Sequence, residues 1–293
     1  MSTLKQRAPH GLKVLGRRVS LSAGLRTSSR RMVPAFVLAG AQRCGTTSLF
    51  RALLDHPAIV GPVHHKGVNY FDVNYVEGWP WYQAHFPVRS LASVRTRRAD
   101  EDAVTFDASG YYIYHPHAAD RIAKDLPDAK VLVMLRDPVE RAFSAYRHEF
   151  ARGYETESFE RALDLEDERV EPELEKMLVD PTYASFSHRH HSYRRRGFYA
   201  EQLRRFTEAL GENQVLVVDS DKFFTEPQQE YPRIIDFLGL RPHLPATFDQ
   251  WNARPGSPMS DGARRQLVAA FEPHDAELEQ MLGHTPSWRR YGG

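Results

Sequence analysis

The stretch Ala35-Phe-Val-Leu-Ala-Gly40-Ala-Gln-Arg-Cys-Gly45-Thr-Thr-Ser-Leu-Phe50-Arg-Ala-Leu-Leu54 decides the fold of this chain. Its first five residues are apolar, which predicts a short strand that is buried on both faces. Gly40 and Gly45 then bracket a tight turn, and from Thr46 onward leucines recur at helical spacing. The sequence therefore predicts a strand, a glycine loop and a helix, in that order.

A glycine loop that leads into a helix suits phosphate-like anions. Glycines let the backbone curl so that several N–H groups point into one concavity, and the helix N-terminus adds a partial positive charge. Arg43 adds a full charge with forked donors, and Thr46, Thr47 and Ser48 add hydroxyl groups. An ordinary turn between strand and helix fits the same glycine spacing, so a second motif is needed to decide.

The glycine spacing matches the nucleoside-triphosphate loop G-x-x-x-x-G-K-[ST]. However, Thr46 stands where that motif requires lysine, and the positive charge lies at Arg43 inside the loop. No acidic strand end suits magnesium, because the other strong strand ends at Arg136. The loop therefore suits an anion that is already joined to a nucleotide and is handled without a metal.

A second informative stretch is Lys130-Val-Leu-Val-Met-Leu135-Arg-Asp-Pro-Val-Glu140-Arg-Ala-Phe-Ser-Ala145-Tyr-Arg-His-Glu-Phe150. It predicts a buried strand that ends near Leu135, followed by a helix. Asp137 is a natural N-cap, and Pro138 fits the first helical position.

Polar residues at the junction of that strand and helix predict a second anion site. Arg136 lies at the carboxyl end of the strand, where open α/β sheets bind their ligands. Arg141, Ser144 and His148 share one face of the helix, because they are three and four residues apart. A solvated polar face is the alternative, and the first stretch makes it the weaker one.

Composition bounds the class of protein. The chain has 293 residues, of which 41% are hydrophobic and 26% charged, which is typical of a globular protein. The net charge of +1 gives no global field that would favour nucleic acid. Cys44 is the only cysteine, which excludes an internal disulfide and permits a reducing compartment, and the expected location is the cytoplasm. Arginine far outnumbers lysine, which indicates a bacterial, GC-rich genome.

The sequence predicts a basic leader over residues 1–33 and a single domain over residues 34–293. No acidic residue precedes Asp55, and residues 1–31 are rich in Lys and Arg. This segment lacks the apolar core of a secretory signal, and no run in the chain approaches a membrane span. Two interpretations are open: a flexible leader, or a peripheral tether whose Leu12, Leu15 and Val19 contact an anionic membrane.

Three further segments carry weaker signals. Residues 155–180 are acidic and predict a solvated helix and loop rather than a metal site. The basic stretch of residues 188–199 suits either a loop that clamps anionic groups or simple surface exposure. Residues 241–261 are rich in Pro and Gly and predict an irregular flap.

The two main stretches together resemble the sulfotransferases that use 3′-phosphoadenosine 5′-phosphosulfate, particularly the carbohydrate (heparan-sulfate type) branch and its bacterial relatives. The first is similar to G-x-x-K-x-G-T-[TS]-x-L, with Arg43 in place of the lysine. The second is similar to R-[DN]-P-x-x-R-x-[YF]-S-x-Y, and Gly197-Phe-Tyr199 to the G-[FW]-Y segment. The resemblance runs in order from about residue 34 to residue 288. It implies a P-loop-like α/β fold with three layers and a mostly parallel central sheet flanked by helices.

The resemblance also implies a reaction. A sulfuryl group would move from the cofactor to a hydroxyl or amine of a carbohydrate, a glycolipid or another metabolite, with no metal. Arg43 would neutralise charge on the leaving phosphate, and His148 would lie near the reacting centre. Arg136 and Ser144 would hold the 3′-phosphate. The implied cofactor contacts are Gly40, Gln42, Arg43, Cys44, Gly45, Thr46, Thr47, Ser48, Arg136, Ser144, Phe198 and Tyr199.

The chain departs from the family where the general base is expected. The carbohydrate branch has K-E-x-x-[FY]-F-D, whereas here Gly67 replaces the glutamate in Lys66-Gly-Val-Asn-Tyr-Phe-Asp72, whose residues 68–71 predict a short strand. Ala108 replaces a lysine that is frequent in the family. An alcohol acceptor still needs a base within hydrogen-bond reach, directly or through a water. The candidates are His64, His65, Asp107 and His148.

Two other functions stay open beside a sulfotransferase with a small-molecule or glycan acceptor. A nucleotide-dependent kinase of the P-loop type is disfavoured by the missing loop lysine and the missing magnesium carboxylate. A non-catalytic protein that binds the cofactor or its bisphosphate product would explain Gly67. The sequence does not predict the acceptor or the oligomeric state.

Overall fold

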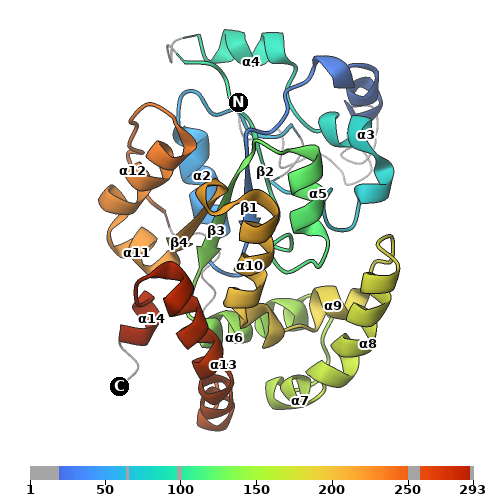
Figure 1. Cartoon of the computed structure of the whole chain (residues 1–293), viewed down its shortest axis with the longest axis vertical. Coiled ribbons are helices and arrows are strands. Elements are labelled where there is room, and N and C mark those ends of the chain that lie inside the picture. Colours follow the sequence, from blue (N-terminus) through green and yellow to red (C-terminus); the bar gives the residue numbers. More distant parts are fainter. Residues whose placement is uncertain (1–19, 64–65, 98–100, 250–257, 291–293) are drawn as a thin grey trace.

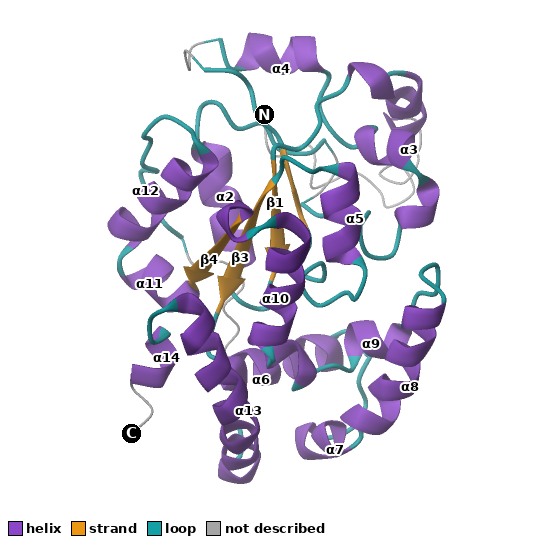
Figure 2. Cartoon of the chain, viewed as in Figure 1, coloured by secondary structure: helices purple, strands orange, loops and turns teal. Residues whose placement is uncertain are grey.

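A computed structural model describes residues 20–63, 66–97, 101–249 and 258–290. Its described part contains one sheet of four parallel strands, β1 (Phe36–Gly40), β2 (Phe106–Ala108), β3 (Lys130–Leu135) and β4 (Val215–Asp219), in the order β2-β1-β3-β4. Figures 1 and 2 show the sheet at the centre with helices on both faces and all strands running toward the same edge. The predicted parallel α/β architecture is confirmed. Outside the described residues lie the candidate bases His64 and His65, the tether residues Leu12, Leu15 and Val19, and residues 250–257 of the predicted flap.

Helices and short helical turns connect and cover the strands. Their bounds are η1 Ser28–Arg30, α2 Thr46–Asp55, η2 Tyr75–Glu77, α3 Trp79–Gln83, α4 Arg89–Arg95, α5 Ala118–Asp125, α6 Pro138–Ala151, α7 Phe159–Asp164, α8 Glu166–Val179, α9 Phe186–His190, η3 Arg195–Gly197, α10 Tyr199–Leu210, η4 Glu212–Gln214, α11 Ser220–Thr225, α12 Pro227–Leu238, α13 Asp261–Leu282 and α14 Ser287–Arg290. No helix in these described ranges is both long and apolar enough to cross a membrane.

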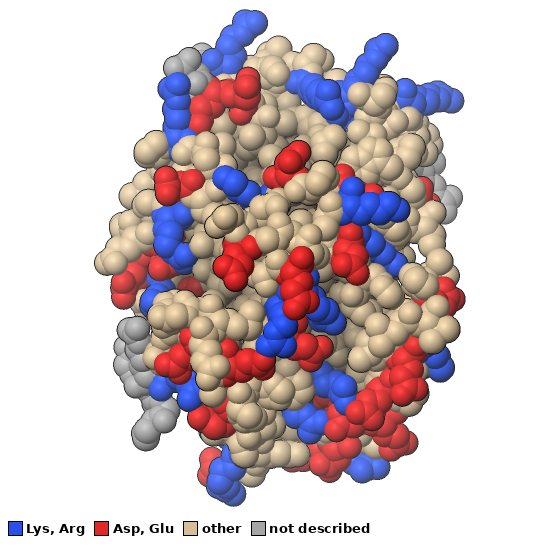
Figure 3. All heavy atoms as spheres, viewed as in Figure 1, with Lys and Arg blue, Asp and Glu red and all other residues tan. Residues whose placement is uncertain are grey.

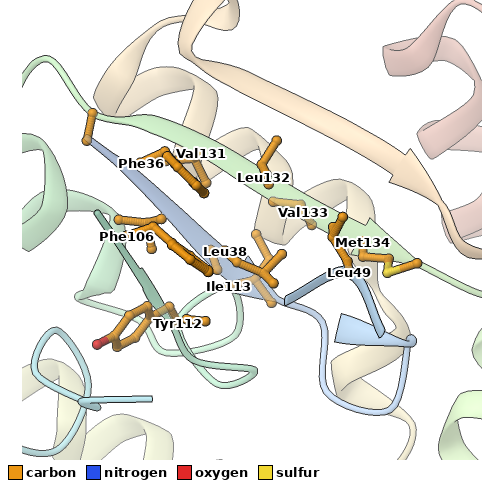
Figure 4. Packing of buried hydrophobic residues seen from close by; sticks show 14 of the residues in the cluster. Phe36, Leu38, Leu49, Phe106, Tyr112, Ile113, Val131, Leu132, Val133 and Met134 are labelled. Carbon is orange, nitrogen blue, oxygen red and sulfur yellow. The ribbon is translucent and has the colours of Figure 1, made fainter. Parts of the chain in front are cut away.

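The core lies between the sheet and its helices. All residues of β1 are buried, and so is β3 from Val131 onward, because helices cover both faces of these inner strands. The rings of Phe36 on β1 and Phe106 on β2 stack with centroids 4.7 Å apart, as Figure 4 shows. The apolar runs that predicted two buried strands therefore form the centre of the sheet.

The segment of residues 68–71 is not the short strand that the sequence predicted. Side chains take two of its backbone donors: Val68 N–H donates to Asp107 Oδ1 at 3.2 Å, and Tyr70 N–H donates to Tyr112 Oη at 2.8 Å. These contacts replace strand pairing and fix the segment beside the end of β2.

The acidic and basic stretches of the second half of the chain pair with each other. Figure 3 shows acidic side chains gathered over α7 and α8. Glu166 is buried and accepts the backbone N–H groups of Arg194 and Arg195, while the two arginine side chains pair with Asp167. The prediction of a merely solvated acidic helix is therefore wrong at Glu166, whose carboxylate is a structural cap.

A buried carboxylate joins the last two helices and gives a testable pH dependence. Asp275 on α13 accepts Trp288 Nε1–H at 3.0 Å, while its Oδ1 is buried without a hydrogen-bond partner among the described residues. Burial raises the pKa of Asp275 from 3.8 to about 7. Because the folded state holds this proton more tightly than the unfolded state, the free energy of unfolding should fall as pH rises from about 4 to about 7.

We therefore expect Asp275→Asn to stabilise the protein at pH 8 and to change little at pH 4. The rise in the pKa corresponds to at most about 4 kcal/mol, and an unpartnered amide N–H would reduce the gain to about 1–3 kcal/mol. Thermal unfolding between pH 4 and pH 8 measures the effect. Asp236→Asn, on an exposed position of α12, is the matched control and should leave the pH dependence unchanged. Equal stabilities of Asp275→Asn and the parent at pH 8 would contradict the assignment.

Candidate functional site

The glycine loop joins the carboxyl end of β1 to the N-terminus of α2. Gly45, the residue before α2, has a φ of 87°, and Arg43 also has a positive φ of 71°. Gly40 has a φ of 148°, and a Cβ atom there would lie 2.6 Å from Ile113 Cγ2. The backbone therefore curls tightly at positions where glycine is required, and the first N–H groups of α2 have no partner within the helix. Such an arrangement of backbone N–H groups at the carboxyl edge of a sheet suits an anion.

Arg43 connects this loop to the second motif. Its Nε–H donates to Ser144 Oγ on α6 at 3.0 Å, although the two residues are 101 positions apart. Asp137 caps α6 as predicted, since its Oδ1 accepts Val139 N–H at 2.8 Å. The structure thus brings together one residue from each predicted anion motif. His148 lies one helical turn after Ser144 on α6 and is half-buried.

Arg141 does not face the site in the way its position on the helix predicted. Its side chain is fully buried and donates from Nη2 to the carbonyl of Tyr193, and its Nε and Nη1 have no hydrogen-bond partner among the described residues. Its charge also acts on Cys44 of the loop, where it opposes the burial that raises the pKa of the thiol. Arg141 therefore adds positive potential beneath the loop rather than a direct donor at its surface.

The side chain of Gln42 is held from two sides. Arg196 Nη1–H donates to Gln42 Oε1, and Gln42 Nε2–H donates to Glu149 Oε1 on α6 at 3.4 Å. The second oxygen of Glu149 lies 3.0 Å from Nδ1 of His190, and hydrogen bonding and the charge of His190 hold the pKa of this glutamate below its ordinary value in spite of burial. The network ties the loop to α6 and to the basic stretch.

The basic stretch of residues 188–199 makes its charged contacts with the protein itself. Arg196 is 4% exposed, and its guanidinium group lies 4.8 Å and 5.0 Å from the ring centroids of Tyr111 and Tyr114. Arg194 and Arg195 form ion pairs with α8. Arg194 and Arg195 are therefore paired within the fold rather than simply exposed, and the acidic helix that pairs with them lies almost thirty residues away in the sequence.

The Gly-Phe-Tyr segment reaches both anion motifs. Tyr199 Oη donates to the backbone carbonyl of Arg136 at 3.0 Å and lies 3.7 Å from Cys44 Sγ. Phe198 stacks on His274 of α13, with ring centroids 3.8 Å apart. A separate hollow opens against α2 and α11; it is lined by Ser48, Arg51, Ala52, Asp55, Phe223 and residues 245–249, none of which belongs to the glycine loop.

Sequence reasoning missed one residue at the loop. Lys66 Nζ–H donates to Thr46 Oγ1 at 2.8 Å, and Nζ lies 3.5 Å from Thr47 Oγ1. The signal was present, because Lys66 begins the segment that resembles K-E-x-x-[FY]-F-D. However, no pattern in the sequence connects Lys66 to a threonine twenty residues earlier.

The candidate base Asp107 lies in the interior of the protein. It has no exposed surface and accepts hydrogen bonds from Val68 N–H, Ala108 N–H and Tyr112 Oη. Burial raises the pKa of this carboxylate, and these donors oppose the rise. This environment gives Asp107 a structural role in holding the segment that carries Lys66. Nearby, Ser109 Oγ lies 2.9 Å from Asp72 Oδ2, and burial raises the pKa of Asp72 to about 6.

Comparison with known proteins identifies the family. The family described as "Sulfotransferase domain" matches residues 34–252, so the chain belongs to the sulfotransferase family and is an enzyme of that class. A crystal structure of a sulfotransferase from Alicyclobacillus acidocaldarius is similar to it, with 31% identity and a TM-score of 0.65 over 88% of this chain and 99% of that one.

Curated relatives share the same part of the sequence. A human bifunctional heparan sulfate N-deacetylase/N-sulfotransferase 3 is 27% identical, covering 88% of this chain and 31% of the relative. Human heparan sulfate glucosamine 3-O-sulfotransferase 3B1 is 24% identical, covering 89% of this chain and 66% of the relative. The chain thus spans about a third of the length of the first of these relatives.

Proposed function

We propose that this enzyme transfers a sulfuryl group from 3′-phosphoadenosine 5′-phosphosulfate to an amine or hydroxyl group of a carbohydrate acceptor. The observation that carries the proposal is the hydrogen bond between Arg43 of the glycine loop and Ser144 of the second motif. It brings a residue of the glycine loop next to a residue of the second motif, which supports a ligand with phosphate groups at both its 3′ and 5′ ends. The names of the curated relatives support a sugar acceptor.

The residues present fit this cofactor. The glycine loop and the start of α2 would bind the 5′ end, with Arg43 as the cation of the loop. Ser144 and Arg136 would hold the 3′-phosphate, and Phe198 and Tyr199, whose hydroxyl group contacts the Arg136 carbonyl, would lie near the nucleoside. When bound, the cofactor supplies a sulfuryl group that is already activated on a phosphate. The protein would then contribute positioning and charge stabilisation.

We propose that His148 orients the acceptor and takes its proton. Among the candidates from the sequence, Asp107 is enclosed by three donors, whereas His148 is half-buried on the helix whose Ser144 contacts Arg43. Imidazole is the side chain most often used for this step near neutral pH. A reducing compartment such as the cytoplasm, and membrane contact through residues 1–31, are further parts of the proposal that rest on the sequence.

Calorimetric titration of the full chain tests the cofactor. We expect adenosine 3′,5′-bisphosphate to bind with a dissociation constant in the micromolar range or below and to bind equally well in EDTA. ATP with magnesium is the comparison ligand. Preference for ATP with magnesium would replace the proposal with a P-loop kinase. Tight binding of the bisphosphate with no transfer of labelled sulfuryl groups to any sugar would favour the non-catalytic binding protein.

An acceptor pair separates the two acceptor chemistries. Heparan oligosaccharides with free glucosamine amines and the same oligosaccharides after N-acetylation differ only at the nitrogen. Transfer to the first alone indicates an N-sulfotransferase, and equal transfer to both indicates transfer to a hydroxyl. Transfer to neither, with labelled donor bound, would contradict a heparan-type acceptor.

A further inference from the structure

A lysine amine lies against the first residues of the helix that follows the glycine loop. Lys66 Nζ is 2.8 Å from Thr46 Oγ1 and 3.5 Å from Thr47 Oγ1. Thr46 begins α2 and is only 8% exposed. Thr46 is also the position at which the nucleoside-triphosphate loop carries its lysine. The amine absent from the loop sequence is thus supplied from a different segment of the chain.

This amine has no counter-charge in the part of the chain that the structure describes. Burial alone lowers the pKa of Lys66 from 10.5 to about 7, with no carboxylate to oppose the change. Its hydrogen-bond partners are two neutral hydroxyl groups, and the ring of Phe50 lies 5.8 Å away. A cation that has lost water without gaining an anion is costly. An anion bound in the loop would remove that cost.

The backbone beside Lys66 is held against the end of β2. Val68 N–H donates to Asp107 Oδ1, and a Cβ atom at Gly67 would lie only 2.6 Å from the carbonyl oxygen of Ala108. The chain therefore passes directly over the end of β2, with no room for a side chain at residue 67. The close contact at Gly67 positions the neighbouring Lys66 so that its side chain reaches α2. Glycine, in place of the family's glutamate, is the residue that this contact allows.

We propose that Lys66 is the second cation of the 5′ anion site and binds the phosphosulfate end of the cofactor together with Arg43. The inference rests on the proposed function and adds a binding residue to it. Arg43 approaches from the loop and α6, whereas Lys66 approaches from the segment beside β2. The two cations reach the loop from different elements, and charge on the 5′ group would be shared between them.

Calorimetry with two nucleotides tests the proposal. Adenosine 3′,5′-bisphosphate carries the 5′ group, and adenosine 3′-monophosphate lacks it. We expect Lys66→Met to weaken binding of the bisphosphate about 10- to 100-fold and to leave binding of the 3′-monophosphate within about twofold of the parent. Lys66→Arg should retain part of the bisphosphate affinity, because it keeps the charge and changes its shape.

Lys124→Met, on an exposed position of α5, is the matched control and should leave both affinities unchanged. Equal weakening of both nucleotides by Lys66→Met would overturn the proposal, because it would show that Lys66 only supports the fold of the loop. Unchanged affinity for the bisphosphate would overturn it as well. If Lys66→Met fails to fold, Lys66→Gln serves in its place. Failure of the parent protein to bind the bisphosphate would instead refute the proposed function.

Discussion

Replacement of Arg43 by alanine is expected to lower the rate of sulfuryl transfer by about 10²- to 10³-fold, the range found when a preorganised charge-stabilising group is removed. The guanidinium group lies in the loop, where its Nε–H donates to Ser144 Oγ. In the proposed reaction, negative charge builds on the leaving phosphate at this loop, and a neutral side chain cannot offset it. Single-turnover transfer with labelled sulfuryl donor measures the chemical step directly.

Because Arg43 has an unusual backbone conformation, the alanine variant needs a matched control. Its φ of 71° is unfavourable for any residue with a Cβ atom, so alanine keeps this strain and loses only the side chain. Arg43→Lys keeps the charge and carries the residue that is usual in the family. We expect it to recover most of the transfer rate at an unchanged unfolding temperature. Ser144→Ala should lose about tenfold or less, since it removes one neutral acceptor of Arg43. Full transfer by Arg43→Ala would exclude the role of this residue.

The sequence predicts the parts of the site that depend on local structure. The strand, loop and helix around Gly40 and Gly45 follow from glycine spacing and helical periodicity, and the cap at Asp137 follows from its position before Pro138. Arg136 could be placed at the carboxyl end of β3 because a buried strand of six residues ends just before it. Each of these inferences uses only residues within about ten positions of one another.

Contacts between distant segments could not be predicted in this way. From the sequence, the basic residues 194–196 suit either an anion clamp or an exposed surface, whereas the structure pairs two of them with α8 and buries the third against Tyr111 and Tyr114. The predicted strand over residues 68–71 does not form because Asp107 and Tyr112, about forty residues later, accept hydrogen bonds from its backbone N–H groups. The contact of Lys66 with Thr46 also joins separate segments and could not be predicted from local patterns. Charge and hydrogen bonding across the fold decide these roles.

Restoring the family's glutamate at position 67 is expected to damage the enzyme. A Cβ atom at Gly67 would lie 2.6 Å from the carbonyl oxygen of Ala108, which belongs to β2 and cannot easily move. Any larger residue must push the segment away from the sheet, which costs about 1–3 kcal/mol as other overpacking does. The shift would also draw Lys66 from Thr46 and weaken the hydrogen bond from Val68 N–H to Asp107. We therefore expect both Gly67→Ala and Gly67→Glu to lower the unfolding temperature and to bind adenosine 3′,5′-bisphosphate more weakly.

A second glycine gives a control of opposite sign. Gly262 lies in the first turn of α13, and a Cβ atom there would meet nothing within 4 Å, so Gly262→Ala should stabilise the protein by about 0.5–1 kcal/mol. Thermal unfolding and bisphosphate titration of Gly67→Ala, Gly67→Glu and Gly262→Ala measure the changes in stability and affinity. Comparing the two sites separates the steric clash at residue 67 from the general effect of replacing a glycine. A Gly67→Glu variant that transfers sulfuryl groups faster than the parent would contradict this argument, because it would mean that the segment can move aside and accept a carboxylate base. If the variant is instead less stable and slower, the backbone of this enzyme excludes a glutamate at position 67. Another residue must then accept the proton of the acceptor group.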